Sequence, residues 1–105
     1  PVKAALFPLV RKDRLPEKAK EIINELKYDF NIIYEERDSI GRRYTRQDLI
    51  GTPFCITVDH KTLEDDTVTV RHRDTMEQNR LHIDQLNDFI RRETSMTNIL
   101  EQIKL

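Results

Sequence analysis

The residues best suited to bind a charged ligand lie in the segment GRRYTRQDLIGTPFCITVD, residues 41–59. Arg42, Arg43 and Arg46 surround Tyr44 there, and we call these four residues the arginine cluster. A guanidinium grips phosphate through two parallel hydrogen bonds, and an aromatic ring stacks on an unpaired base. Arg42 and Arg46 are four positions apart, which places them on one face of a helix. The cluster therefore indicates a nucleic-acid contact.

A second arginine-bearing segment, TVTVRHRDTMEQ, follows at residues 67–78. A strand there places Arg71 and Arg73 on one face of a sheet. Two such elements in one small domain favour single-stranded RNA as the ligand. The alternative is that these arginines are solvated charges, neutralised in the helix by Glu35, Glu36 and Asp38 and placed in the strand at a sheet edge.

His60 follows Asp59 at the end of a predicted strand, where ligands of open sheets bind. The residue types leave two roles open for His60, stacking on a base or an ordinary position in a turn. A nucleophile built from Cys55, Asp59 and His60 is not expected, because a thiol inside a buried strand is normally inert. One cysteine and three scattered histidines also lack metal-ligand spacing. With only two glycines the chain has no phosphate-binding loop, so we predict no cofactor for this domain.

The composition predicts one domain in a reducing compartment. The chain has 105 residues and a single cysteine, which excludes an internal disulfide. Its net charge of −1 excludes the global basic field that indiscriminate duplex binding needs. No apolar run reaches the length of a membrane span, and we expect a cytoplasmic protein. The start at Pro1 rather than Met indicates a piece of a longer protein or a processed product.

The two kinds of basic residue are unevenly distributed. Seven of the eleven arginines lie between Arg37 and Arg80, whereas five of the seven lysines lie in the first 27 residues. Arginine gives planar bidentate contacts and lysine serves as a solvated charge. The distribution predicts a recognition surface in the middle of the chain and a general surface at its N-terminal end.

The elements that position these residues begin with a strand–helix–strand unit. Residues 2–7 form an apolar strand that Pro8 ends, because proline has no ladder donor. Asp13 is the predicted cap of a helix that runs to residue 26, and residues 30–35 form the second strand. Such a unit gives parallel strands with a right-handed crossover.

The rest of the chain predicts a second helix and an antiparallel extension of the sheet. Ser39 caps a helix that ends at about Ile50, where Gly51 suits a left-handed stop. The remaining predicted elements are strands at 54–59 and 67–73 around a polar turn at 61–66, an edge strand at 79–83, a helix capped by Asp84, and an amphipathic helix at 96–103. Together these elements give an α/β fold with a mixed sheet and helices on its faces.

Three segments, KAALFPLV, SIGRRYTRQDLIGTPFCITVD and TVTVRHRDTMEQ, together resemble the C-terminal anticodon-binding domain of class II aminoacyl-tRNA synthetases. The sequence is most similar to the homodimeric type of glycyl-tRNA synthetase. The resemblance covers residues 1–93 and leaves 94–105 as a C-terminal helical tail. It implies a three-layer α/β fold with a five-stranded mixed sheet, parallel at its start and antiparallel at its edge, and three main helices.

The resemblance also implies a function. It implies recognition of the tRNA glycine anticodon, whose second and third bases are cytosines. By position, Arg42 matches an arginine that reads the anticodon, and His60 matches a side chain beside an anticodon base. An arginine can donate to the acceptors of cytosine while Asp48 or Asp59 accepts from its amino group. The full set of candidate tRNA-binding residues is Arg42, Arg43, Tyr44, Arg46, Asp48, Asp59, His60, Arg71 and Arg73.

The same resemblance places catalysis outside this chain. The family's aminoacylation site, which uses ATP and Mg²⁺, lies in a separate catalytic domain of a homodimeric protein, and none of its motifs is present here. The chain is therefore expected to bind tRNA and not to acylate it. The alternative is a protein-interaction or polymerase-accessory module of the same fold without tRNA specificity. The arginine cluster argues against that module, which has no need of it.

Overall fold

The computed structural model describes residues 2–93, which form a five-stranded mixed sheet in the order β2-β1-β3-β4-β5. β1 pairs in parallel with β2 and β3, whereas β4 and β5 add antiparallel ladders. This arrangement confirms the predicted fold class. The strands are β1 (Ala4–Pro8), β2 (Ile32–Tyr34), β3 (Phe54–Val58), β4 (Thr67–His72) and β5 (Gln78–His82).

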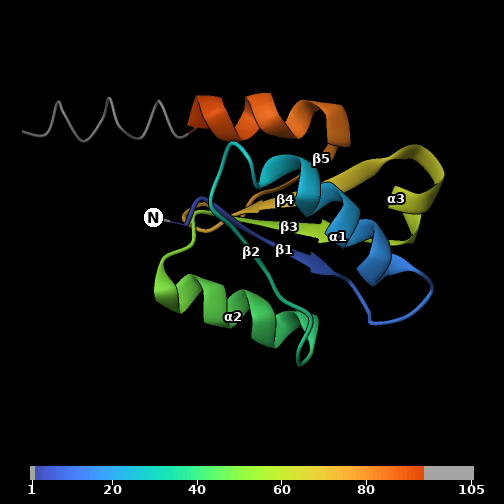
Figure 1. The fold of residues 1–105 in the computed structure, drawn as a ribbon. Helices are drawn as coiled ribbons and strands as arrows, with labels where there is room; N and C mark the ends of the chain where they lie inside the picture. Colours follow the sequence, from blue (N-terminus) through green and yellow to red (C-terminus); the bar gives the residue numbers. More distant parts are fainter. Residues whose placement is uncertain (1, 94–105) are drawn as a thin grey trace, which may run out of the picture.

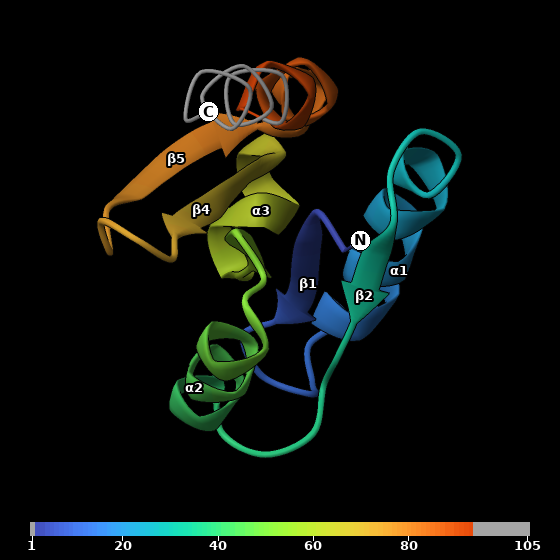
Figure 2. The same ribbon diagram turned by 90° about the vertical axis from the view of Figure 1, so that its left-hand side faces the viewer.

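Helices cover both faces of the sheet. One face carries α1 (Leu15–Leu26) and the helical residues 86–93, and the other carries α2 (Ile40–Ile50), as Figures 1 and 2 show. A short helix, α3 (His60–Asp65), follows β3 at the carboxyl end of that strand. The connections through α1 and α2 move in opposite directions along the sheet. Two right-handed crossovers therefore place their helices on opposite faces.

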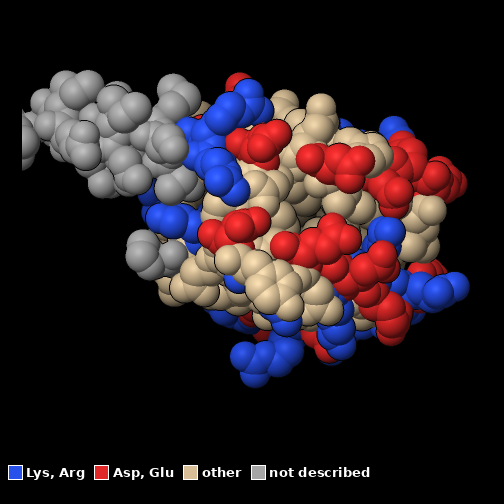
Figure 3. All heavy atoms as spheres, turned by 45° about the horizontal axis from the view of Figure 1, so that its top comes forward, with Lys and Arg blue, Asp and Glu red and all other residues tan. Residues whose placement is uncertain are grey.

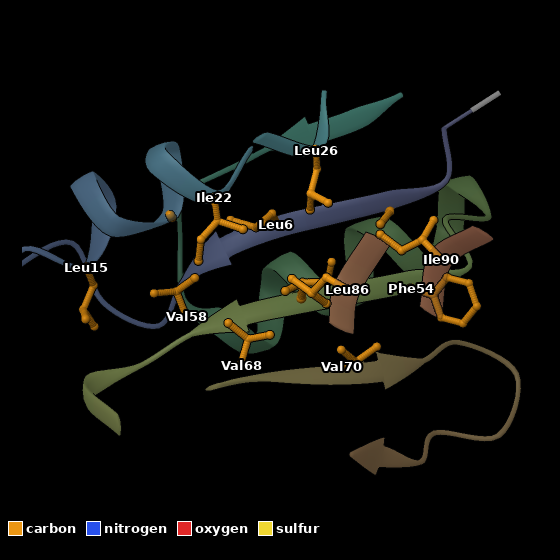
Figure 4. Packing of buried hydrophobic residues seen from close by; sticks show 13 residues of the cluster. Leu6, Leu15, Ile22, Leu26, Phe54, Val58, Val68, Val70, Leu86 and Ile90 are labelled. Atoms are coloured by element: carbon orange, nitrogen blue, oxygen red, sulfur yellow. The ribbon is translucent and has the colours of Figure 1, made fainter. Parts of the chain in front are cut away.

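The main core lies between the sheet and the layer of α1 and residues 86–93. Figure 4 shows Ile22 and Leu26 of α1 and Leu86 and Ile90 of the last helix over the strands. The two valines of β4, Val68 and Val70, are buried on this face. A smaller cluster of Ala5, Phe7 and Cys55 packs under α2. The core therefore fixes the ends of the strands from both faces.

Two predicted helix caps are wrong. α1 begins after Arg14, whose backbone is left-handed and whose side chain does not cap the helix. The predicted cap, Asp13, hydrogen-bonds to His60 instead. At the last helix, the backbone N–H of Asp84 donates to Nδ1 of His82 at 3.1 Å, so His82 is the cap. This cap opens the 3-10 turn Ile83–Gln85, which leads into residues 86–93.

The predicted polar turn at 61–66 is also wrong, because α3 occupies most of it. Asp59 accepts from the backbone N–H of Thr62 at 3.2 Å, and Thr62 Oγ1 accepts from the N–H of Asp59 at 3.0 Å. This reciprocal pair is a capping box, which satisfies two donors at the start of the helix. The predicted tail helix falls within 94–105, outside the described residues. In residues 2–93 no helix is long and apolar enough to cross a membrane.

Candidate nucleic-acid interface

A crevice forms where β1 and β2 end. These adjacent parallel strands send their connections to opposite faces, through loop 9–14 to α1 and through loop 35–39 to α2. In open α/β sheets ligands bind outside the carboxyl ends of such strands. A shallow pocket of about 610 Å³, which we call the crevice pocket, opens at this end. It is lined by Leu9, Val10, Arg11, Asp38, Ser39, Ile40 and Arg43.

Five exposed cations lie on the segments that form the crevice pocket. Arg11, Lys12 and Arg14 belong to loop 9–14, Arg37 belongs to loop 35–39, and Arg42 lies in the first turn of α2. Within residues 2–93, none of these five side chains makes a hydrogen bond or an ion pair. Solvated guanidinium and ammonium groups of this kind are free to contact phosphate. The structure thus brings Arg42 together with basic residues that the sequence analysis had assigned to a general surface.

His60 lies at the same end of the sheet, as the first residue of α3. Its Nε2 is 2.9 Å from Oδ2 of Asp13 in loop 9–14, and both side chains are about half exposed. The sequence left two roles open for His60, stacking on a base or an ordinary position in a turn. The structure places His60 at the start of a helix and not in a turn. His60 thereby holds loop 9–14 and keeps part of its ring in solvent.

Asp59, predicted to accept from a base, is already engaged. Arg80 donates to its two carboxylate oxygens at 2.8 and 2.5 Å, and Arg80 also donates to Thr67 and Thr69 of β4. The hydrogen bonds from Arg80 lower the pKa of Asp59 below its usual value. Asp59 therefore fixes the start of α3, and with it His60, rather than facing a ligand.

Replacing Asp59 with asparagine should make the free energy of unfolding less dependent on pH in the acid range. A carboxylate whose pKa is lowered in the folded state contributes stability above its unfolded pKa, and this contribution is lost as pH falls through the folded pKa. Chemical denaturation from about pH 6 to about pH 2.5 should show a smaller acid-induced loss for Asp59→Asn than for wild type. Asp74→Asn, at an exposed ion pair, is the control. Equal acid-induced losses for Asp59→Asn and wild type would contradict the assignment.

Arg43 is the main departure from the predicted site. Only 2% of its surface is exposed, so it cannot serve as the phosphate contact that the arginine cluster suggested. Its guanidinium donates to the carbonyl of Pro8 at 2.6 Å, of Leu9 at 3.2 Å and of Glu35 at 3.5 Å. The guanidinium also lies over the ring of Phe7, 5.5 Å from its centroid. Burial lowers the pKa of Arg43 from its ordinary value.

Two further members of the arginine cluster, Arg46 and Tyr44, contact other side chains of the domain. Arg46 forms ion pairs with Glu35 and Asp38, as the solvated-charge alternative anticipated for this helix. The hydroxyl of Tyr44 lies 2.6 Å from Oγ1 of Thr57, and its ring packs edge-on against Phe7. Of the four residues in the cluster, only Arg42 is exposed without a side-chain partner in residues 2–93.

Arg71 and Asp48 form a bidentate ion pair far from the crevice pocket. Arg71 donates to the two oxygens of Asp48 at 2.9 and 3.1 Å and lies over the ring of Tyr44, 4.9 Å from its centroid. Arg71 is buried and pairs across the sheet with Cys55, at the start of β3. Arg73 follows β4 and donates to Asp74. Because β4 runs antiparallel to β3, its arginines reach the opposite end of the sheet from His60.

The structure also bears on the predicted roles of the cysteine and on metal binding. Cys55 is buried, and desolvation raises the pKa of its thiol to about 12, so it is not a nucleophile. His72 packs edge-on against Phe54, with ring centroids 5.0 Å apart. No group of three or more histidine, cysteine or acidic side chains in residues 2–93 could hold a metal ion.

The face opposite α2 is acidic. Figure 3 shows carboxylates gathered over α1 and the neighbouring turns. A surface depression between α1 and the start of the last helix is lined by Glu21, Glu25, Asp66 and Asp84, together with Lys18 and His82. Carboxylates repel phosphate, so the part of this face over α1 disfavours RNA.

The three basic residues of loop 9–14 and the supporting role of Arg80 were not predicted from the sequence. The signal for the first was available, because the run RKDR follows the first predicted strand. The carboxyl ends of parallel strands meet at one edge of a sheet, which places this run beside His60. The role of Arg80 depends on the register of β5, which pairs Arg80 with Thr69, and the sequence carries no signal for that register.

Comparisons with known proteins show the family of the chain. A family model described as "Anticodon binding domain" matches residues 3–93. A glycine–tRNA ligase of Rhodopirellula baltica is 56% identical over 86 residues, which are 82% of this chain and 16% of that protein. A glycine–tRNA ligase of Borreliella afzelii is 53% identical over 103 residues, 98% of this chain and 23% of that protein. The chain thus spans about a fifth of the curated relatives it matches.

A solved structure supports the fold. The RNA-binding domain of threonyl-tRNA synthetase from Cryptosporidium parvum Iowa II superposes with a TM-score of 0.76 over 85% of this chain and 22% of that chain. The identity is 23%, so this likeness shows a shared fold and nothing about the ligand.

Proposed function

Because the chain belongs to the anticodon-binding domain family, we propose that it reads the anticodon of tRNA for glycine as one domain of a glycine–tRNA ligase. The observation that carries the proposal is the set of five cations, without side-chain partners in residues 2–93, on the segments that form the crevice pocket, of which Arg11 lines it. A pocket with an apolar lining and a cationic rim suits an unpaired base whose flanking phosphates are neutralised. The carboxylates over α1 disfavour binding of RNA there.

The chemistry of the pocket suits a cytosine. Arg42 can donate to the ring nitrogen and carbonyl on the Watson–Crick edge of a base, which is accessible in a single-stranded loop. Asp48 and Asp59 are each held by an arginine through both carboxylate oxygens. Asp38 lines the pocket, and Arg46 engages only its Oδ2, so Oδ1 of Asp38 replaces them as the acceptor for the exocyclic amino group. His60 then serves as a neighbouring ring surface at the same end of the sheet.

Aminoacylation, with its ATP and Mg²⁺, belongs in this proposal to the part of a full-length protein that lies outside this chain. The curated relatives are four to six times longer than the region they share with it. The full-length protein is proposed to be a cytoplasmic homodimer whose catalytic domain is in the same polypeptide. The alternative, an interaction module without tRNA specificity, does not account for the five cations, without side-chain partners in residues 2–93, on the segments that form the crevice pocket.

Binding of the chain to RNA hairpins tests the proposal. We expect affinity for a loop that presents the glycine anticodon to exceed affinity for an otherwise identical loop with uridines in place of its cytosines. We also expect the logarithm of the association constant to fall with the logarithm of the salt concentration with a slope of about −2 to −4. Three to five cations would contact phosphates, and each contact contributes about −0.7 to this slope. Fluorescence anisotropy over a salt series measures both quantities. Equal affinity for both loops and for duplex RNA would overturn the proposal.

A further inference from the structure

The two loops that form the crevice pocket have a strained backbone. Of the five non-glycine residues with positive φ in residues 2–93, three lie in these loops: Asp13 (59°), Arg14 (67°) and Asp38 (66°). Such conformations are costly and persist only where the surrounding structure holds them. The loops therefore need contacts that fix them.

Arg43 supplies such contacts to both loops. From α2 its guanidinium reaches the carbonyls of Pro8 and Leu9, where β1 passes into loop 9–14. The same group reaches the carbonyl of Glu35, the first residue of loop 35–39, at 3.5 Å. A planar fork with several donors can hold carbonyls from two segments at once, whereas an ammonium group is a compact point charge. The residue thus lies between the two walls of the pocket.

Stability alone does not account for an arginine at this position. Burying a cation is costly, and Nε of Arg43 has no hydrogen-bond partner among the described residues. An apolar side chain of similar volume against Phe7 would avoid that cost. Unfavourable local features of this kind are expected at functional sites, where they serve the geometry of the site.

We propose that Arg43 is a positioning residue, which sets the separation and orientation of loops 9–14 and 35–39 so that Arg42 and Asp38 meet a base in the crevice pocket. The inference rests on the proposed function, because its consequence is base discrimination. Arg43 itself touches neither base nor phosphate. It acts through the two loops, as supporting residues do when they fix a binding geometry.

The test is the variant Arg43→Lys, which keeps the charge and removes the planar fork. Circular dichroism establishes that the variant is folded at the assay temperature. We expect the preference for a cytosine over a uridine loop to fall by about tenfold, the usual scale for loss of a supporting residue. The salt slope should stay within about 0.3 of wild type, because no phosphate contact is lost. Amide hydrogen exchange should accelerate in loops 9–14 and 35–39 and not at the end of α2.

Two further variants keep the proposal open to refutation. Phe7→Leu removes the ring under the guanidinium and should reduce the preference in the same direction by a smaller factor. Arg91→Lys is the matched control, because this guanidinium also lies over a ring and donates to a carbonyl oxygen, but on the other face. It should leave the preference unchanged.

The outcomes separate the two hypotheses. A folded Arg43→Lys with wild-type preference and wild-type loop exchange would overturn the positioning role and leave the proposed function intact. A salt slope flattened by about 0.7 in a folded Arg43→Met variant, which removes the charge, would instead make Arg43 a phosphate contact. A wild-type chain without any cytosine preference would overturn the proposed function, and the positioning role with it.

Discussion

Removing the three cations of loop 9–14 should weaken RNA binding by about a hundredfold at 0.1 M salt. Each phosphate contact in a single strand contributes about 0.7 to the salt slope, which corresponds to about fivefold in affinity at that concentration. Replacing Arg11, Lys12 and Arg14 with alanine should therefore flatten the slope by about 2. The loss should be equal for cytosine and uridine loops, because phosphate contacts carry no sequence information.

A matched triple variant separates local contacts from net charge. Alanine at Lys3, Lys20 and Lys27 changes the net charge by the same amount, but these lysines lie outside the loops of the crevice pocket. This variant should lose little affinity, and its salt slope should be close to that of wild type. If both triple variants weakened binding equally, the effect would be one of overall charge, and loop 9–14 would not be the contact.

The sheet and its helices were largely predictable, because the spacing of apolar residues and the positions of proline and glycine indicate the same elements along most of the chain. Pro8 and Gly51 ended their elements as expected, the latter with φ of 84°. One of the errors arises because a side chain has a distant partner. Asp13 bonds to His60, 47 residues away, and so leaves its predicted cap. A local reading of the sequence cannot anticipate such a contact.

The site was predictable only in part, because residue type does not reveal burial. Arg42 and Arg43 are adjacent and identical in type, yet one is exposed and the other is 2% exposed. Successive residues of a helix point about 100° apart, so one of the pair faces the sheet. β4 runs antiparallel to β3, which places Arg71 at the end of the sheet opposite to the site. This direction follows from strand pairing and not from a sequence motif.

Replacing Arg42 with alanine should lower affinity for a cytosine loop by roughly 5- to 150-fold, equivalent to about 1–3 kcal/mol. The loss on a uridine loop should be much smaller, so that the variant binds both loops almost alike. Arg42→Lys should not restore the preference, because an ammonium group lacks the planar fork. Thermal stability should be nearly unchanged, because in residues 2–93 the side chain of Arg42 has no hydrogen bond or ion pair to lose.

Competition binding with hairpins that differ only in the two cytosines measures this loss. Arg92→Ala is the control, because Arg92 is also an exposed arginine on a helix but lies on the opposite face of the sheet. The competing role for an arginine in this helix, holding Glu35 and Asp38, is filled by Arg46. Equal losses on both loops after Arg42→Ala would mean that Arg42 contacts the backbone of the RNA, and base reading would then have to come from Asp38 and His60.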